Sequence, residues 1–363
     1  MKSFKAFLLA VLSIGTPVAT QFITDRFEVD VNSNRLGGCG YIGRDRLNRM
    51  LRDCVTLADY GMLAIDDFSN MQRPEARRLV SSFFKAGSIA QRNEVRERYR
   101  RVRDWILDGG PIDNGRLNQR PVLTCHHDWE ETRLMSDVAQ DMNGNDIVDE
   151  NNRVMRIRDI DEYRRTQAGV AANQRPPVPV SNIFPYWSSL YNFYSFDIAY
   201  GVSPADGYCT PEEHEGRTFL FVRGIITLCP QAVRASSRTD SGWTYQELHA
   251  RAVTTISVND VQGNGRPPAG SDTLYVIEPS AAVLFHEIFH LVLGNGNGET
   301  SPPNYPREVY QVSRMMRIGH EDAVCNPETF TKVATAYDYT RNSNRVDGEL
   351  IEWFMGFATR GDT

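Results

Sequence analysis

Two histidines and a glutamate that could bind and use a metal ion lie close together in the second half of the chain, in the order His286-Glu287-Ile-Phe-His290. On an α-helix, residues four positions apart share one face, so both imidazoles can reach the same ion. Zinc is the metal for which this pair of nitrogen ligands is typical. Glu287 follows the first ligand, where it can take a proton from a water molecule. The pattern therefore predicts a catalytic site with one zinc ion.

The segment from Ser280 to Gly294 predicts the helix that this pattern needs. Ser280 suits the position before the first turn, and Gly294 suits the left-handed position after the last. The side chains flanking the two histidines are apolar, so we expect the helix to be buried almost all round. Two histidines and a glutamate buried there without partners would cost several kcal/mol, which favours a bound ligand over a plain core helix.

A catalytic zinc site needs a third protein ligand and one open position. Candidates downstream are Glu299, Glu308, Glu321 and Asp322, with His320 as a nitrogen alternative. Glu308 ranks first, ahead of Asp322 and Glu299, because it lies eighteen positions after His290, in the first turn of a helix expected over Pro306–Ile318. Tyr310 could donate a hydrogen bond to the oxyanion of a tetrahedral intermediate, although an aromatic residue at that spacing could equally be a packing residue.

The start of the chain is typical of a secretory signal peptide over residues 1–20. Lys2 and Lys5 precede an apolar stretch over residues 6–14 that is too short to span a bilayer. We therefore expect a secreted chain that begins near Gln21 and does not cross a membrane.

The cysteines support the same compartment. Their number is six, which is even and in an exported chain favours three disulfides with the pairing left open. They are Cys39, Cys54, Cys125, Cys209, Cys229 and Cys325.

Periodicity divides the remaining chain into two parts. Apolar residues recur at helical spacing up to Gly110, which predicts a helical N-terminal region over residues 21–110, either a packed subdomain or a removable pro-segment. Residues 111–363 add short apolar runs separated by turns, which together with the later helices indicates an α+β fold. Strands are expected at 121–125, 154–157, 218–222, 225–228 and 273–277, with a type I′ hairpin turn at Asn143-Gly144. The strand at 273–277 could pair with an extended substrate.

Other patterns favour structural roles. The basic run at 96–103 alternates with acids and apolar residues, so it is interpreted as a solvated helix face and not as a nucleic-acid site. The oxygen-rich segment at 141–149 favours a hairpin over a calcium loop. His126 and His127 are expected to face opposite ways on a strand, which disfavours a second metal site. We expect a monomer that acts on protein or peptide substrates.

A resemblance to a known family covers roughly residues 180 to 340. Besides the signal peptide and cysteines, it depends on Ile225–Pro230, the helix with His286 and His290, and Asn326–Phe330. These features are similar to the deuterolysin-like fungal metallopeptidases, the aspzincin group, as a distant relative. The resemblance implies a zincin-like metallopeptidase domain over residues 111–363, one zinc ion and cleavage of peptide bonds. In that group the third ligand is the Asp of Gly-Thr-x-Asp-x-x-Tyr-Gly; this string is absent here, and Glu308 and Tyr310-Gln311 stand in the corresponding region.

The sequence thus predicts a secreted zinc endopeptidase in which Glu287 is the general base. The alternative is a secreted zinc-binding or host-interaction protein that keeps the fold and lacks turnover. A further alternative is an N-terminal helical module that folds alone and binds a partner.

Overall fold

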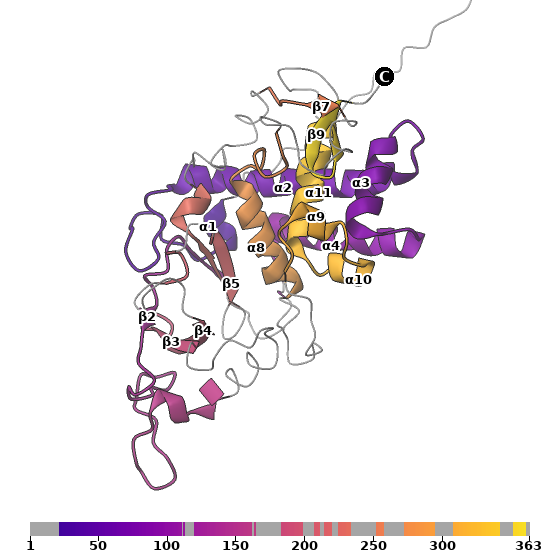
Figure 1. The fold of residues 1–363 in the computed structure, drawn as a ribbon. Coiled ribbons are helices and arrows are strands. Elements are labelled where there is room, and N and C mark those ends of the chain that lie inside the picture. Colours follow the sequence, from indigo (N-terminus) through magenta and orange to yellow (C-terminus); the bar gives the residue numbers. More distant parts are fainter. Residues whose placement is uncertain are drawn as a thin grey trace, which may run out of the picture.

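A computed structural model of the chain describes residues 22–110, 112, 120–161, 163–164, 183–198, 207–210, 214–219, 224–233, 252–257, 272–294, 308–341 and 351–360. The expected signal peptide and one candidate ligand, Glu299, lie outside these residues. The described chain combines helices with three small sheets, so it has the mixed composition expected of an α+β protein (Figure 1).

The N-terminal region is helical, as the periodicity predicted. Its helices are α1 (Ile23–Arg26), α2 (Arg44–Asp66), η1 (Asp67–Ser69), α3 (Pro74–Phe84) and α4 (Ile89–Asp108). The later helices are η2 (Ile157–Asp159), η4 (Pro230–Val233), α8 (Ala281–Leu293), α9 (Val312–Met315), α10 (His320–Ala323) and α11 (Pro327–Arg341). Helix α4 begins at a capping box between Ser88 and Gln91, and its arginines form ion pairs on the exposed face. No described helix is long and apolar enough to cross a membrane.

The N-terminal helices share one core with the later helices α8 and α11 (Figure 1). Helices α2 and α4 approach closely at Gly61, where an added Cβ would lie 2.2 Å from the Tyr99 ring. The Tyr99 hydroxyl in turn donates a 2.7 Å hydrogen bond to the backbone oxygen of Phe330 in α11. Removing residues 21–110 would therefore expose the buried faces of both later helices.

One sheet separates this core from a smaller one. Strand β1 (Val122–Thr124) pairs in parallel with β6 (Ile225–Leu228), and β6 pairs antiparallel with β5 (Gly216–Phe219). Alternate side chains point to opposite faces of a strand. Those on one face belong to the helical core, namely Leu123, Ile226 and Leu228. Those on the other belong to an aromatic cluster with Trp129, namely Val122, Ile225 and Phe219.

Two further sheets are described. One contains β2 (Glu131–Thr132), β3 (Ile183–Ser188) and β4 (Phe193–Ile198), and the other contains β7 (Ile256–Ser257), β9 (Phe357–Arg360) and β8 (Ile351–Phe354). Isolated bridges between residues 138 and 156 form short hairpins, as expected for segment 141–149. The strand expected at 154–157 is absent from these described residues, which form bridges and the start of η2. The turn at Asn143-Gly144 is not type I′, because Gly144 has a positive φ and Asn143 does not.

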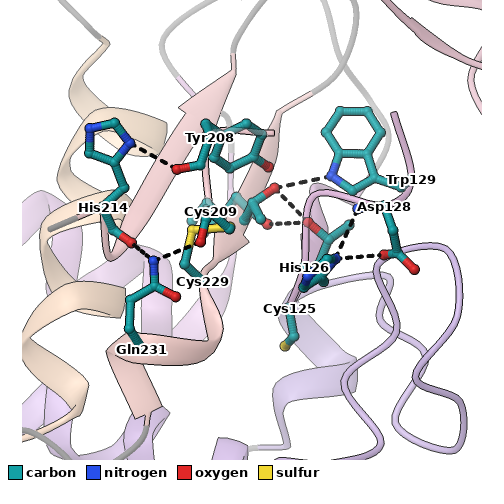
Figure 2. Close-up of a disulfide and its surroundings, with 12 residues drawn as sticks. Cys125, His126, Asp128, Trp129, Tyr208, Cys209, His214, Cys229 and Gln231 are labelled. Atoms are coloured by element: carbon teal, nitrogen blue, oxygen red, sulfur yellow. Dashed lines mark hydrogen bonds and ion pairs between the residues drawn. A yellow bond between two sulfur atoms is a disulfide. The ribbon is translucent and has the colours of Figure 1, made fainter. Parts of the chain in front are cut away.

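The prediction of three disulfides is wrong. The structure has two, Cys39–Cys125 and Cys209–Cys229, and the second joins the segment that carries Tyr208 to the residue after β6 (Figure 2). Cys54 and Cys325 are free. The Cys54 thiol lies in the core and donates to the backbone oxygen of Ala281. The even number of cysteines does not indicate which of them point from a helix into the protein core, as Cys54 does from α2.

Two expected elements near the site are also different. The helix expected over 306–318 is reduced, in its described part, to α9, because backbone groups at Val309 and Val312 bond to side chains. The strand expected over 273–277 is a single bridge from Thr273 to Phe357 followed by a turn. The hydroxyl of Tyr275 accepts from the Val312 N–H and donates to the Tyr310 oxygen, so this turn holds the 309–312 segment in place.

Candidate metal centre

Helix α8 presents the two histidines on one face, as the spacing predicted. Their ring centroids lie 5.0 Å apart. The helix is buried along most of its length, and it ends at Gly294, whose φ of 84° is the conformation that favours glycine. Ser280 lies at the N-terminal end, but its side chain makes no capping hydrogen bond. The apolar flanks that predicted burial thus fix α8 in the core.

Glu308 comes from the non-helical segment before α9 and lies between the two imidazoles. Its Oε1 contacts His290 Nε2, and its Oε2 lies 3.7 Å from His286 Nε2. One ligand atom from each of these three residues can be chosen so that all lie within 4.8 Å of one another. Two histidines and one glutamate form a donor set found in catalytic zinc sites. The residues present therefore fit a metal ion.

The backbone around Glu308 is held by polar side chains rather than by a helix. The amide of Asn326 bonds to both backbone groups of Val309, accepting from its N–H at 3.2 Å and donating to its oxygen at 2.9 Å. This bidentate contact resembles one rung of a β-ladder and stops the segment from coiling. Glu308 was ranked first for its spacing from His290 and its place in an expected helix, yet it reaches the histidines from a segment that is not helical.

The other candidate ligands lie elsewhere. Asp322 in α10 is not part of the metal-binding group found among the described residues. The His320 ring bonds to the Phe84 backbone oxygen at 2.8 Å and to Glu94 at 3.2 Å. Both ring nitrogens of His320 therefore have other partners.

Tyr310 is at the mouth of the site. Its hydroxyl donates to Glu308, and its ring stacks on His286 with an interplanar angle of 13° and centroids 6.0 Å apart. The residue is 55% exposed, and its ring packs on His286 as the alternative interpretation expected, while its hydroxyl is bonded to a candidate ligand.

Glu287 is buried beside strand β5. Its carboxylate oxygen Oε2 accepts a 2.6 Å hydrogen bond from the Thr218 hydroxyl. Gly216 on the same strand leaves room for the carboxylate, since an added Cβ would lie 2.8 Å from Oε1. Burial raises the pKa of Glu287, although the two histidines and Thr218 oppose that rise. The sequence did not single out Thr218. Because neighbouring side chains of a strand point to opposite faces and Phe219 belongs to the aromatic cluster, Thr218 lies on the side of α8.

Two charged residues of α11 lie behind His286. Its Nδ1 donates to Glu328 of α11 at 3.1 Å, and Glu328 is paired with the buried Lys332. Burial lowers the pKa of His286, but hydrogen bonds to Glu308 and Glu328 outweigh this and raise it well above its usual value. Glu328 lies within the segment Asn326–Phe330, whose sequence pattern predicts no role for it.

The second histidine pair has another arrangement. His126 and His127 follow β1 in a bend, and their rings stack with centroids 4.3 Å apart, so the expectation that they face opposite ways is wrong. The neighbouring Asp128 accepts from the N–H groups of Leu36 and Gly37. This pair is not part of the metal-binding group found among the described residues.

Comparison of the chain with models of protein families, with curated proteins and with solved structures finds no match.

Proposed function

We propose that this chain is a secreted zinc-dependent endopeptidase with a zincin-like domain, whose metal is held by His286, His290 and Glu308. The observation that carries the proposal is the convergence of two imidazole nitrogens and a carboxylate within 4.8 Å, next to a buried glutamate on the same helix. The two disulfides support an oxidising compartment.

In this proposal the chain supplies the proton transfers. A bound zinc ion would polarise the scissile carbonyl and lower the pKa of water. Glu287 takes a proton from the attacking water as the new carbon–oxygen bond forms, and passes it to the amine as the carbon–nitrogen bond breaks. Thr218 orients Glu287 by holding one carboxylate oxygen. The Tyr310 hydroxyl, which is bonded to Glu308 here, is the proposed donor to the oxyanion.

The substrate is proposed to lie along β5. This strand is at the end of its described sheet and packs beside α8, with Gly216 and Thr218 facing Glu287. An extended peptide can add to such an edge through backbone hydrogen bonds. Strand β5 replaces the segment 273–277 in this role, because that segment is a turn.

The test is proteolysis by the zinc-loaded chain. A mixed peptide library is incubated with the protein, and the products are identified by mass spectrometry, with a chelator-treated sample as the control. New termini that appear only in the zinc-loaded sample support the proposal. A chain that binds one zinc ion and leaves the whole library intact supports the alternative of a zinc-binding protein without turnover.

A further inference from the structure

Lys332 is a buried cation close to the metal site. Its side chain is 1% exposed, and its ammonium lies 2.5 Å from Glu278 Oε2 and 2.9 Å from Glu328 Oε1. It also lies 4.2 Å from the centre of the Tyr275 ring. An ammonium is buried only at a high free-energy cost unless charges and hydrogen bonds compensate it. Two carboxylates and an aromatic face supply that compensation.

Glu328 uses both of its oxygens in this network. Oε1 accepts from Lys332, and Oε2 accepts from His286 Nδ1. The carboxylate is therefore held between an ammonium and the ring of a metal-ligand candidate.

Helix packing creates this alignment. Glu328 and Lys332 are four residues apart on α11, and His286 and His290 are four residues apart on α8. The two helices pack against each other, so the register between them sets Glu328 behind His286. A hydrogen bond to Nδ1 fixes the ring orientation and the tautomer, and leaves Nε2 to face Glu308.

The two histidines are supported unequally. Among the described residues the buried Nδ1 of His290 has no hydrogen-bond partner, whereas that of His286 has Glu328. His286 is thus the ligand whose orientation is set from behind.

We propose that Glu328 is a positioning residue that fixes His286 for metal binding, and that Lys332 holds Glu328 in place. This inference rests on the metal site of the proposed function. Support of this kind typically contributes about 10- to 100-fold to metal affinity.

The test compares two carboxylate-to-amide changes in one helix. Glu328→Gln removes the charge behind His286, and Asp338→Asn removes the other buried carboxylate of α11, which bonds to Tyr60 and not to the site. Zinc affinity is measured by competition with a chromophoric chelator, and site geometry by the visible absorption of the cobalt-loaded protein. We expect Glu328→Gln to weaken zinc binding about 10- to 100-fold and to change the cobalt spectrum. We expect Asp338→Asn to retain both at wild-type values.

The inference is overturned if Glu328→Gln binds zinc as the wild type does, or if both variants weaken binding equally. If Glu328→Gln does not fold, the triple change Glu278→Gln/Glu328→Gln/Lys332→Met removes both anions together with the cation that they share, and the same loss is expected. A wild-type chain that binds no zinc defeats the proposed function itself. A wild-type chain that binds zinc, with Glu328→Gln unaffected, defeats only the positioning role.

Discussion

The two histidine pairs of this chain have similar residue types and different surroundings. His286 and His290 are one helical turn apart and converge on the carboxylate of Glu308. His126 and His127 are consecutive, and their rings stack on each other in a bend. Imidazoles near a carboxylate are present in both regions, yet only the first pair directs two Nε2 atoms towards one point among the described residues.

The carboxylates explain the rest of the difference. Asp128 is occupied by the N–H groups of Leu36 and Gly37, so it supports a loop. Glu308 faces the ring nitrogens directly, and Glu328 supports one ring from behind. The candidate metal centre thus combines two acids. Glu308 faces the Nε2 atoms of the histidines, and Glu328 bonds to Nδ1 of His286 from the other side.

The largest expected effect is a loss of catalysis without a loss of metal binding at the His286 and His290 pair. Glu287→Gln removes the base while keeping the size of the side chain, so peptidase activity should fall by about 10²- to 10⁴-fold. Zinc content should stay at the wild-type value, because Glu287 is not a ligand in the group. The measurement is kcat on a peptide found in the library experiment, together with zinc analysis of the same sample. Retained activity in this variant would exclude Glu287 as the base.

The next effect contrasts the two pairs directly. Structural zinc sites are worth about 10–16 kcal/mol for four ligands, so loss of His290 in His290→Ala should weaken zinc binding by on the order of 10²- to 10³-fold. His127→Ala should leave zinc affinity unchanged, since its ring stacks on His126 outside the group. Competition with a chelator measures both variants. Equal losses in the two would mean that the pairs do not differ as described.

The sequence predicted those elements of the fold and of the site that depend on the local spacing of residues. The helix of His286 and His290 follows from periodicity and apolar flanks, and it appears at Ala281–Leu293. The N-terminal helices follow in the same way, because each has an apolar stripe at 3.6-residue spacing.

Parts that depend on distant contacts were not predictable from spacing. The Asn326 amide forms two hydrogen bonds with the backbone of Val309, where the chain is not helical, and a pattern of apolar residues contains no trace of these bonds. Cys54 faces a core that only the packed helices create. Glu328 and Lys332 have the spacing of an exposed i, i+4 ion pair, and only their burial against α8 makes them part of the site.

A third prediction concerns Tyr310 at the mouth of the site. Removing an oxyanion donor typically costs about 10²- to 10³-fold in kcat, so Tyr310→Phe should lower kcat by about 10²-fold. The ring still stacks on His286 in this variant, so zinc affinity should change little. Steady-state kinetics on zinc-loaded protein measure the effect. An unchanged kcat would leave Tyr310 with only its contact to Glu308.

The smallest expected effect comes from β5, the strand that packs beside the helix of His286 and His290. Thr218→Val keeps the shape of the side chain and removes the hydrogen bond to Glu287 Oε2. A hydrogen bond to a charged group contributes about 1.5 kcal/mol at the lower end, so kcat/KM should fall about tenfold. Thermal unfolding of the variant serves as the control for global stability. A fall as large as that of Glu287→Gln would indicate that Thr218 does more than orient the base.

Anomalous diffraction at the zinc edge from crystals soaked in zinc would show directly which side chains hold the metal. We predict one peak at about 2.0–2.1 Å from Nε2 of both His286 and His290, with Glu308 as the third ligand. A peak bound by His126 and His127, a third ligand other than Glu308, or no peak at all would contradict the metal centre described above.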